Sequence, residues 1–204
     1  MSETTSEPLG GEVGRAAFRR LLRTGRRAEV RDLASDLGRP VEEVEARVAA
    51  LDAEGRMRLD DAGGVVGAAG LSVVPDRHRL DLDRRTLWTW CAFDLIGIAG
   101  ALRADGVGRS VSPWSGLPLE VRFRGGQPEP GPLALFRPDD AERAGCRNLY
   151  REWCSNTNLF ESPEAARAWS EQRRLRGRVL GLGEAADLAR GRWEPLTEGL
   201  RWQR

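Results

Sequence analysis

Residues 90–102 read WCAFDLIGIAGAL, and from residue 91 onward they form the longest apolar run of the chain. Such a run predicts a buried helix, which we place at about residues 87–102. One carboxylic acid, Asp94, interrupts it three residues after the thiol of Cys91. Residues three apart share a helix face, with Cβ atoms roughly 5–6 Å apart, so both side chains are predicted to reach the same bound atom.

A second tryptophan–cysteine pair, Trp153-Cys154, stands far along the chain. Burial disfavours a charged carboxylate, so Asp94 is a candidate general acid with a raised pKa. If it starts ionised, it can instead take the proton of Cys91 and release it later to a leaving group.

The substrate that fits two thiols and one proton donor is an organomercurial. Thiolates prefer soft metals, and Hg(II) is softer than the usual biological ions. Two thiolates on mercury weaken a carbon–mercury bond, and a nearby acid can protonate the departing carbon. Cys91, Asp94 and Cys154 are therefore the predicted catalytic and mercury-binding residues.

The segment before this region predicts three short helices and a hairpin. The helices are placed at residues 15–23, 28–37 and 40–55, and the hairpin strands at 56–59 and from 65 onward. This is the outline of a winged helix, which in many proteins binds DNA.

The third of these helices argues against DNA binding. A helix that reads DNA presents basic or amide side chains, whereas this one sets Arg47 against Glu42, Glu43, Glu45, Asp52 and Glu54. We interpret the module as a structural or dimerising accessory and expect no nucleic-acid partner. DNA binding through Arg26, Arg27, Arg56 and Arg58 remains the alternative.

The rest of the chain predicts a mixture of strands and helices. A pair of strands turning near Pro75 is expected within residues 71–82, and further strands are expected at 107–111, 117–123, 133–136 and 178–182. Helices are expected at 163–174, with Ser162 as N-cap, and at 183–189. Residues 125–132 are expected to form a surface loop. His78, the only histidine, is expected to be solvated.

The predicted class is α+β: a small helical winged-helix-like N-terminal module followed by a mixed α/β catalytic module with antiparallel strands. The predicted division is a disordered leader at 1–14, the accessory module at 15–70 and the catalytic domain at 71–204.

Composition limits the partners and the compartment. The 32 basic residues, all arginine, are matched by 31 acidic ones, so the net charge gives no general attraction to nucleic acid or anionic lipid. The apolar run is shorter than the roughly 20 residues of a membrane span, and the acidic N-terminus does not resemble a signal peptide, so we expect a cytoplasmic protein. Three cysteines in such a chain predict reduced thiols, and we interpret Cys146 as a structural thiol in preference to a mercury relay.

The chain resembles the organomercurial (alkylmercury) lyases. The likeness is carried by the LWTWCAFD segment of residues 87–94, the SPWSG turn of 112–116, and Trp153-Cys154 with its continuation to Trp169. The resemblance implies that Cys91 attacks mercury, Asp94 handles the proton and Cys154 completes the dithiolate. It also implies that no cofactor is used, and that Hg(II) passes to mercuric reductase or to low-molecular-weight thiols. Ser112 and Ser155 stand where family members can carry further cysteines.

Three alternatives remain open from the sequence. A relative with the same Cys/Asp/Cys site could act on another organometallic or carbon–heteroatom substrate. A thiolate module could carry Zn or Cu(I) without turnover, although structural zinc sites usually have four closely spaced ligands. A winged-helix regulator could sense metal through the same thiols.

Overall fold

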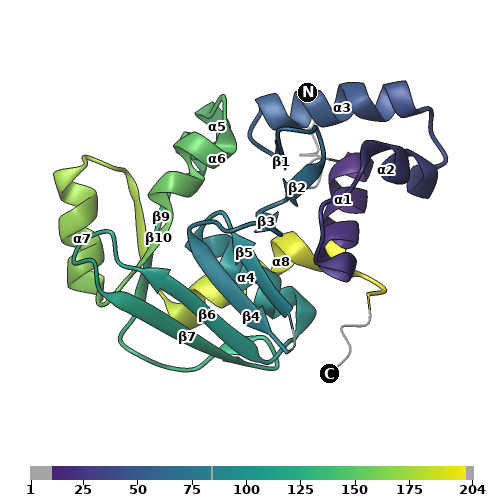
Figure 1. Cartoon of the computed structure of the whole chain (residues 1–204). Helices are drawn as coiled ribbons and strands as arrows, with labels where there is room; N and C mark the ends of the chain where they lie inside the picture. Colours follow the sequence, from purple (N-terminus) through teal and green to yellow (C-terminus); the bar gives the residue numbers. More distant parts are fainter. Residues whose placement is uncertain (1–10, 84, 201–204) are drawn as a thin grey trace, which may run out of the picture.

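The computed structural model describes residues 11–83 and 85–200, and it begins with three helices and a hairpin (Figure 1). The elements are α1 (Gly11–Thr24), α2 (Val30–Leu37), α3 (Val41–Ala53), β1 (Met57–Leu59) and β2 (Val65–Ala68). The predicted order of elements is confirmed. Helix α1 starts four residues before the expected position, so residues 11–14 are helical, while the first ten residues of the predicted leader lie outside the described part.

The hairpin continues directly into an antiparallel sheet. Its further strands are β3 (Leu71–Ser72), β4 (His78–Leu82), β5 (Arg85–Thr89), β6 (Gly106–Val111), β7 (Pro118–Arg124) and β8 (Gln127–Pro128), in the order β1-β2-β3-β5-β4-β6-β7-β8. The predicted pairing within residues 71–82 is wrong, because β3 and β4 do not pair with each other. Both pair with β5, where Leu71 and His78 lie opposite Thr89.

Residues 85–89 form a strand, so the predicted start of the central helix at residue 87 is wrong. Leu87 and Thr89 are buried while Trp88 between them is only half-buried, which is the period-two pattern of a strand. Helix α4 (Ala92–Leu102) begins only after Cys91, and nearly all of its residues are buried.

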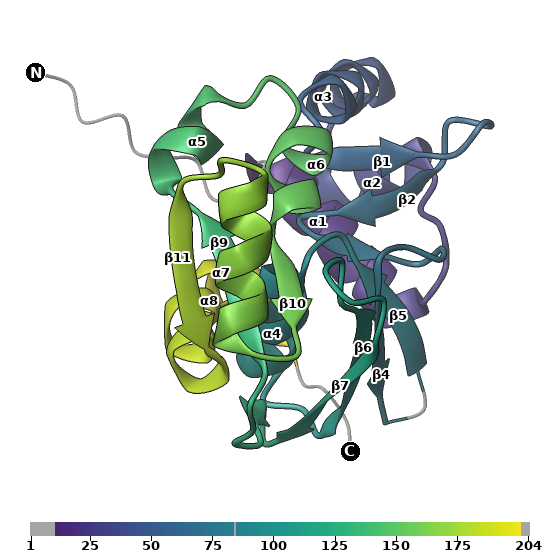
Figure 2. The ribbon, with the colours of Figure 1, turned by 90° about the vertical axis from the view of Figure 1, so that its left-hand side faces the viewer.

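A second, three-stranded sheet has the order β10-β9-β11. Its strands are β9 (Ala134–Pro138), β10 (Asn158–Phe160) and β11 (Gly177–Gly181), and the accompanying helices are α5 (Asp140–Gly145), α6 (Leu149–Glu152), α7 (Pro163–Gln172) and α8 (Leu182–Thr197). Figure 2 shows α7 across the small sheet, with α4 and α8 behind it. The Ser162 cap is confirmed, since its hydroxyl accepts from the Ala165 N–H at 3.2 Å, whereas α8 extends eight residues beyond its predicted end. A short strand, β8, lies within the predicted loop at 125–132.

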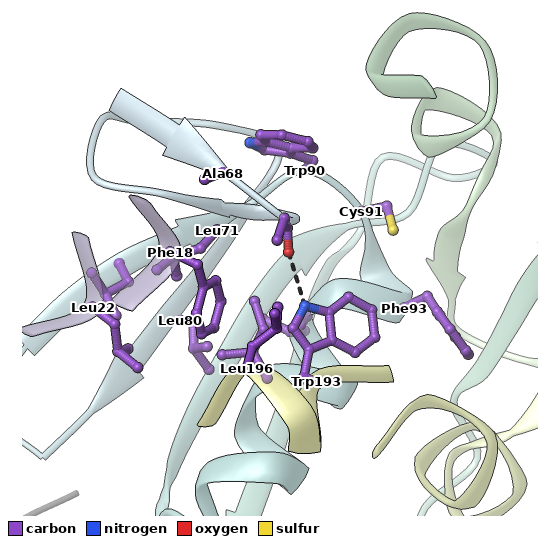
Figure 3. Packing of buried hydrophobic residues seen from close by; sticks show 14 of the residues in the cluster. Phe18, Leu22, Ala68, Leu71, Leu80, Trp90, Cys91, Phe93, Trp193 and Leu196 are labelled. Carbon is purple, nitrogen blue, oxygen red and sulfur yellow. Dashed lines mark hydrogen bonds between the residues drawn. The ribbon is translucent and has the colours of Figure 1, made fainter. Parts of the chain in front are cut away.

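Helix α4 is the centre of the core. It contacts the large sheet, the small sheet and α8, and one continuous cluster of buried apolar residues runs from Phe18 in α1 to Leu196 in α8 (Figure 3). No helix in the described ranges is long and apolar enough to cross a membrane.

His78 is buried, so its predicted solvation is wrong. Alternation along β4 turns His78, Leu80 and Leu82 inward. The imidazole Nδ1 lies 2.8 Å from the Ser110 hydroxyl, and burial lowers the pKa of His78 to about 3.

Candidate active site

Cys91 and Asp94 meet at the N-terminus of α4 as a capping box. Cys91 is the N-cap residue, and its sulfur accepts from the Asp94 N–H while the Asp94 carboxylate accepts from the Cys91 N–H at 3.0 Å. The two side chains are thus fixed by the reciprocal bonds that satisfy exposed donors of a helix start. The sequence spacing correctly predicted that the two side chains lie close together, although Cys91 precedes the helix and does not lie on its face.

Cys154 reaches the same place from a short helical turn after α6. The Asn148 side chain caps α6 by accepting from the Arg151 N–H at 3.0 Å, and Cys154 begins a 3-10 turn over Cys154–Asn156. The Ala92 N–H donates to the Thr157 carbonyl at 3.1 Å. This bond joins the start of α4 to the segment carrying Cys154.

The three predicted side chains form one buried cluster. One ligand atom from each of Cys91, Asp94 and Cys154 lies within 4.8 Å of the others. Cys91 is 0%, Cys154 2% and Asp94 5% exposed. Two thiols and a carboxyl are therefore within reach of a single heavy atom.

Burial controls the ionisation of this cluster. It raises the pKa of Asp94 to about 7, against hydrogen bonds from the Cys91 thiol and N–H that lower it. Burial also raises the pKa of the Cys91 thiol well above its ordinary value. A hydrogen bond from Cys91 is the largest influence on the Cys154 pKa and lowers it, but burial and the Asp94 charge together leave that pKa raised. Asp94 is thus the first of the three groups to lose its proton.

Aromatic side chains and a backbone turn enclose the cluster. Trp90, Phe93, Trp153 and Trp193 line a cavity together with Asp94 and Cys154. The Trp193 indole N–H donates to the Ala69 carbonyl at 2.8 Å and so fixes the turn between β2 and β3 (Figure 3). Gly70 in that turn has φ +88°, and a Cβ there would lie 2.5 Å from Asp94 Cγ.

Comparison with known proteins places the chain in a family. The sequence model of the family described as alkylmercury lyase matches residues 71–193. The alkylmercury lyase of Bacillus cereus is 30% identical over 203 residues, covering 93% of this chain and 86% of that protein. That of Staphylococcus epidermidis is 32% identical over 181 residues, covering 84% and 77%. This chain belongs to the alkylmercury lyase family.

The fold agrees with a solved structure. The mercury-bound form of MerB2 matches with a TM-score of 0.78 and 22% identity, covering 93% of this chain and 98% of that one. The predicted α+β class and the resemblance are confirmed, and the chain is an enzyme of the alkylmercury lyase family.

Several charged and small residues around the cluster were not foreseen from the sequence. Three arginines, Arg56, Arg143 and Arg192, line the cavity from segments far apart in the chain. Gly70 approaches Asp94 from the end of the N-terminal segment. None belongs to a motif with the two cysteines, and only the folded chain brings them together.

The remaining thiol and serines lie outside the cluster. Cys146 is half-buried at the end of α5, where its thiol donates to the Glu142 carbonyl at 3.2 Å. Ser112 is buried in the turn between β6 and β7, and its hydroxyl accepts from the Trp114 N–H at 3.3 Å. The Ser155 hydroxyl donates to the Arg151 carbonyl at 2.6 Å.

Proposed function

We propose that this chain cleaves carbon–mercury bonds by protonolysis, giving Hg(II) and a hydrocarbon, with Cys91 and Cys154 as thiolates and Asp94 as proton donor. The observation that carries the proposal is the buried cluster, in which two sulfurs and a carboxyl oxygen lie within 4.8 Å of one another. Family membership supports the substrate, because the relatives are alkylmercury lyases.

The ionisation order supports a defined proton path. At pH values above about 7, Asp94 is ionised while the thiols keep their protons. A soft metal stabilises thiolates, so the first thiol that binds mercury releases its proton to Asp94, and the proton of the second thiol neutralises the small thiolate that mercury releases. The protonated Asp94 then donates the same proton to the carbon as the carbon–mercury bond breaks.

The apolar cavity supports this transfer. The indole and phenyl rings of Trp90, Phe93 and Trp153 hold water away from the three groups, so the proton passes to carbon in a low-dielectric site. We propose that the reaction needs no cofactor. Written with a small thiol R′SH, the sum is RHg–SR′ + R′SH → RH + Hg(SR′)₂, and small thiols or mercuric reductase would take up the Hg(II).

Hydrocarbon release tests the proposal directly. Purified protein is incubated with phenylmercury and excess thiol, and benzene is measured. Wild type should release benzene, whereas Cys91→Ser and Cys154→Ser should abolish turnover. Cys146→Ser is the matched control, since that thiol lies outside the cluster, and it should keep the wild-type rate.

Asp94→Ala separates binding from proton transfer. The variant should still bind phenylmercury through its two thiols but release benzene about 10²- to 10⁴-fold more slowly, the usual contribution of a positioned acid. A wild-type rate in this variant would remove the proton-donor role. If the wild-type protein bound mercury but released no benzene, the result would favour the alternative that this chain acts on another organometallic or carbon–heteroatom substrate.

A further inference from the structure

Three guanidinium groups surround the cavity that holds the cysteine–aspartate cluster. Arg56 precedes β1, Arg143 lies in α5 and Arg192 lies in α8, and all three line the same cavity as Asp94 and Cys154. We call them the arginine rim.

The carboxylates near the rim do not balance its charge. Arg56 pairs with Glu54 at 3.1 Å, and Arg192 reaches Asp140 at 3.2 Å. Arg137, which lies over the Phe93 ring at 5.2 Å, also binds Asp140. Among the residues that the structure describes, four guanidiniums thus share the surface carboxylates of Glu54 and Asp140, while Asp94 is buried beneath them.

The rim arginines also repel one another. Burial lowers the pKa of Arg143, and the charges of Arg192 and Arg56 lower it further. Burial and the Arg137 charge lower the pKa of Arg192 in the same way. An anion bound among these groups would relieve the repulsion, and guanidinium forks match the geometry of a carboxylate.

We propose that the arginine rim binds a carboxylate carried on a ligand of mercury, and that this ligand is the low-molecular-weight thiol that brings the organomercurial to the enzyme. The proposal rests on the proposed lyase function. Because mercury is soft, an organomercury cation in a thiol-containing solution is bound to a thiolate sulfur. Cys154 and Asp94 are buried, whereas the rim arginines line the same cavity and are half-buried. When the carrier sulfur approaches Cys154 and Asp94, the remainder of the carrier therefore extends toward the rim.

The rim thereby assists an exchange in which atoms and charge balance. An enzyme thiolate forms a sulfur–mercury bond, the bond between mercury and the carrier sulfur breaks, and the carrier leaves as a thiolate. The carbon–mercury bond stays intact in this step and is cleaved afterwards.

Two matched carriers test the proposal. The phenylmercury adduct of mercaptoacetate carries a carboxylate on its thiol, whereas the adduct of 2-mercaptoethanol carries a hydroxyl group. Benzene release gives kcat/KM for each adduct, and wild type should prefer the mercaptoacetate adduct. The ratio of the two kcat/KM values should fall about tenfold in Arg143→Gln or Arg192→Gln, the size of one charged hydrogen bond, and further in the double variant.

A control variant and a second substrate pair complete the design. Arg147→Gln removes an exposed arginine that does not line the cavity, so its ratio should match wild type. Arg143→Lys keeps the charge and should retain part of the preference. Phenylmercury and 4-carboxyphenylmercury, both presented with 2-mercaptoethanol, test whether the carboxylate is instead carried on the organic group.

The outcomes distinguish the possibilities. An unchanged ratio in the rim variants, even with slower turnover on both adducts, would overturn the proposal, because the arginines would then act on the cluster or the fold. Sensitivity of the rim variants only to 4-carboxyphenylmercury would overturn the carrier thiol as the source. Absence of benzene with every substrate would contradict the proposed function itself, not the rim.

Discussion

Asp94 holds a proton in the folded protein at pH values where the unfolded chain has released it. Burial raises its pKa from 3.8 to about 7. Between these values the folded state binds more protons than the unfolded state, so the free energy of unfolding falls as pH rises and levels off above about 7. The acid that serves the proposed chemistry therefore destabilises the fold at neutral pH.

Replacing Asp94 by Asn should remove this loss. The amide oxygen can still accept from the Cys91 N–H, so the capping box persists. As pH rises from 4 to 7.5, the free energy of unfolding of the variant should increase relative to that of wild type by on the order of 2–4 kcal/mol. Urea unfolding of both proteins at several pH values measures the difference. His78 titrates in the same pH range, but its contribution to the free energy of unfolding is the same in both proteins and cancels in the difference. Parallel pH profiles would contradict the buried-acid assignment.

Gly70 is predicted to position the Asp94 carboxylate. A Cβ at Gly70 would approach Asp94 Cγ to 2.5 Å, and φ is +88°. Gly70→Ala should therefore lower benzene release at least about tenfold, since misplacement of about 1 Å can cost two orders of magnitude. Gly63→Ala is the control, because Gly63 has φ +78° but no neighbour within 4 Å of its added Cβ. Both variants should lose about 1 kcal/mol from backbone strain, and equal rates in the two would contradict the positioning role.

At the residue scale, sequence reasoning grouped Cys91, Asp94 and Cys154, which the structure brings together, but it did not foresee every residue around them. A carboxyl in an apolar run beside a thiol is unusual enough to single out Cys91 and Asp94. Gly70 and the arginine rim carry no such local signal, because long-range folding places them. The assignment of His78 failed because its charged neighbours in sequence point to the opposite face of β4.

At the element scale, the contact between α4 and α8 depends on one glycine. A Cβ at Gly97 would lie 2.2 Å from the Trp193 ring, whereas a Cβ at Gly100, one turn later, meets nothing closer than 3.6 Å. Gly97→Ala should therefore cost about 1–3 kcal/mol through overpacking. Gly100→Ala should stabilise by about 0.5–1 kcal/mol, because alanine favours a helix over glycine. Thermal unfolding of both variants measures the effect, and stabilisation by both would mean that α4 and α8 pack less closely.

Element boundaries were predictable only where local signals end an element. Ser162 and Pro163 mark the start of α7, and the structure begins the helix there. Residues 85–89 adjoin the apolar run without a Gly or Pro break, so the sequence alone did not separate strand β5 from helix α4. Their separation comes from pairing with β3 and β4, which no local pattern encodes.

At the scale of the whole molecule, the N-terminal segment borders the cluster of Cys91, Asp94 and Cys154. The turn after α3 holds α6, since the Leu149 N–H donates to the Glu54 carbonyl at 2.9 Å and a Cβ at Gly55 would collide with Asn148. The turn between β2 and β3, at Ala69 and Gly70, covers Asp94. One segment thus supports both the Cys154 and the Asp94 sides of the cluster. The division at residue 70 stays a prediction, although one sheet and one core cluster cross it.

The chain is therefore expected to unfold in one cooperative transition. All seven tryptophans follow residue 87, so their fluorescence reports mainly the predicted catalytic domain, whereas far-UV circular dichroism also reports α1, α2 and α3. Because the shared core couples the two parts, urea curves from the two probes should coincide, as a two-state transition requires. A loss of helical signal before the main change in tryptophan fluorescence would instead show that residues 15–70 unfold as a separate module. Benzene release measured across the same urea range would then decide whether the site depends on that module, because Gly70 and Arg56 leave the cavity when it unfolds.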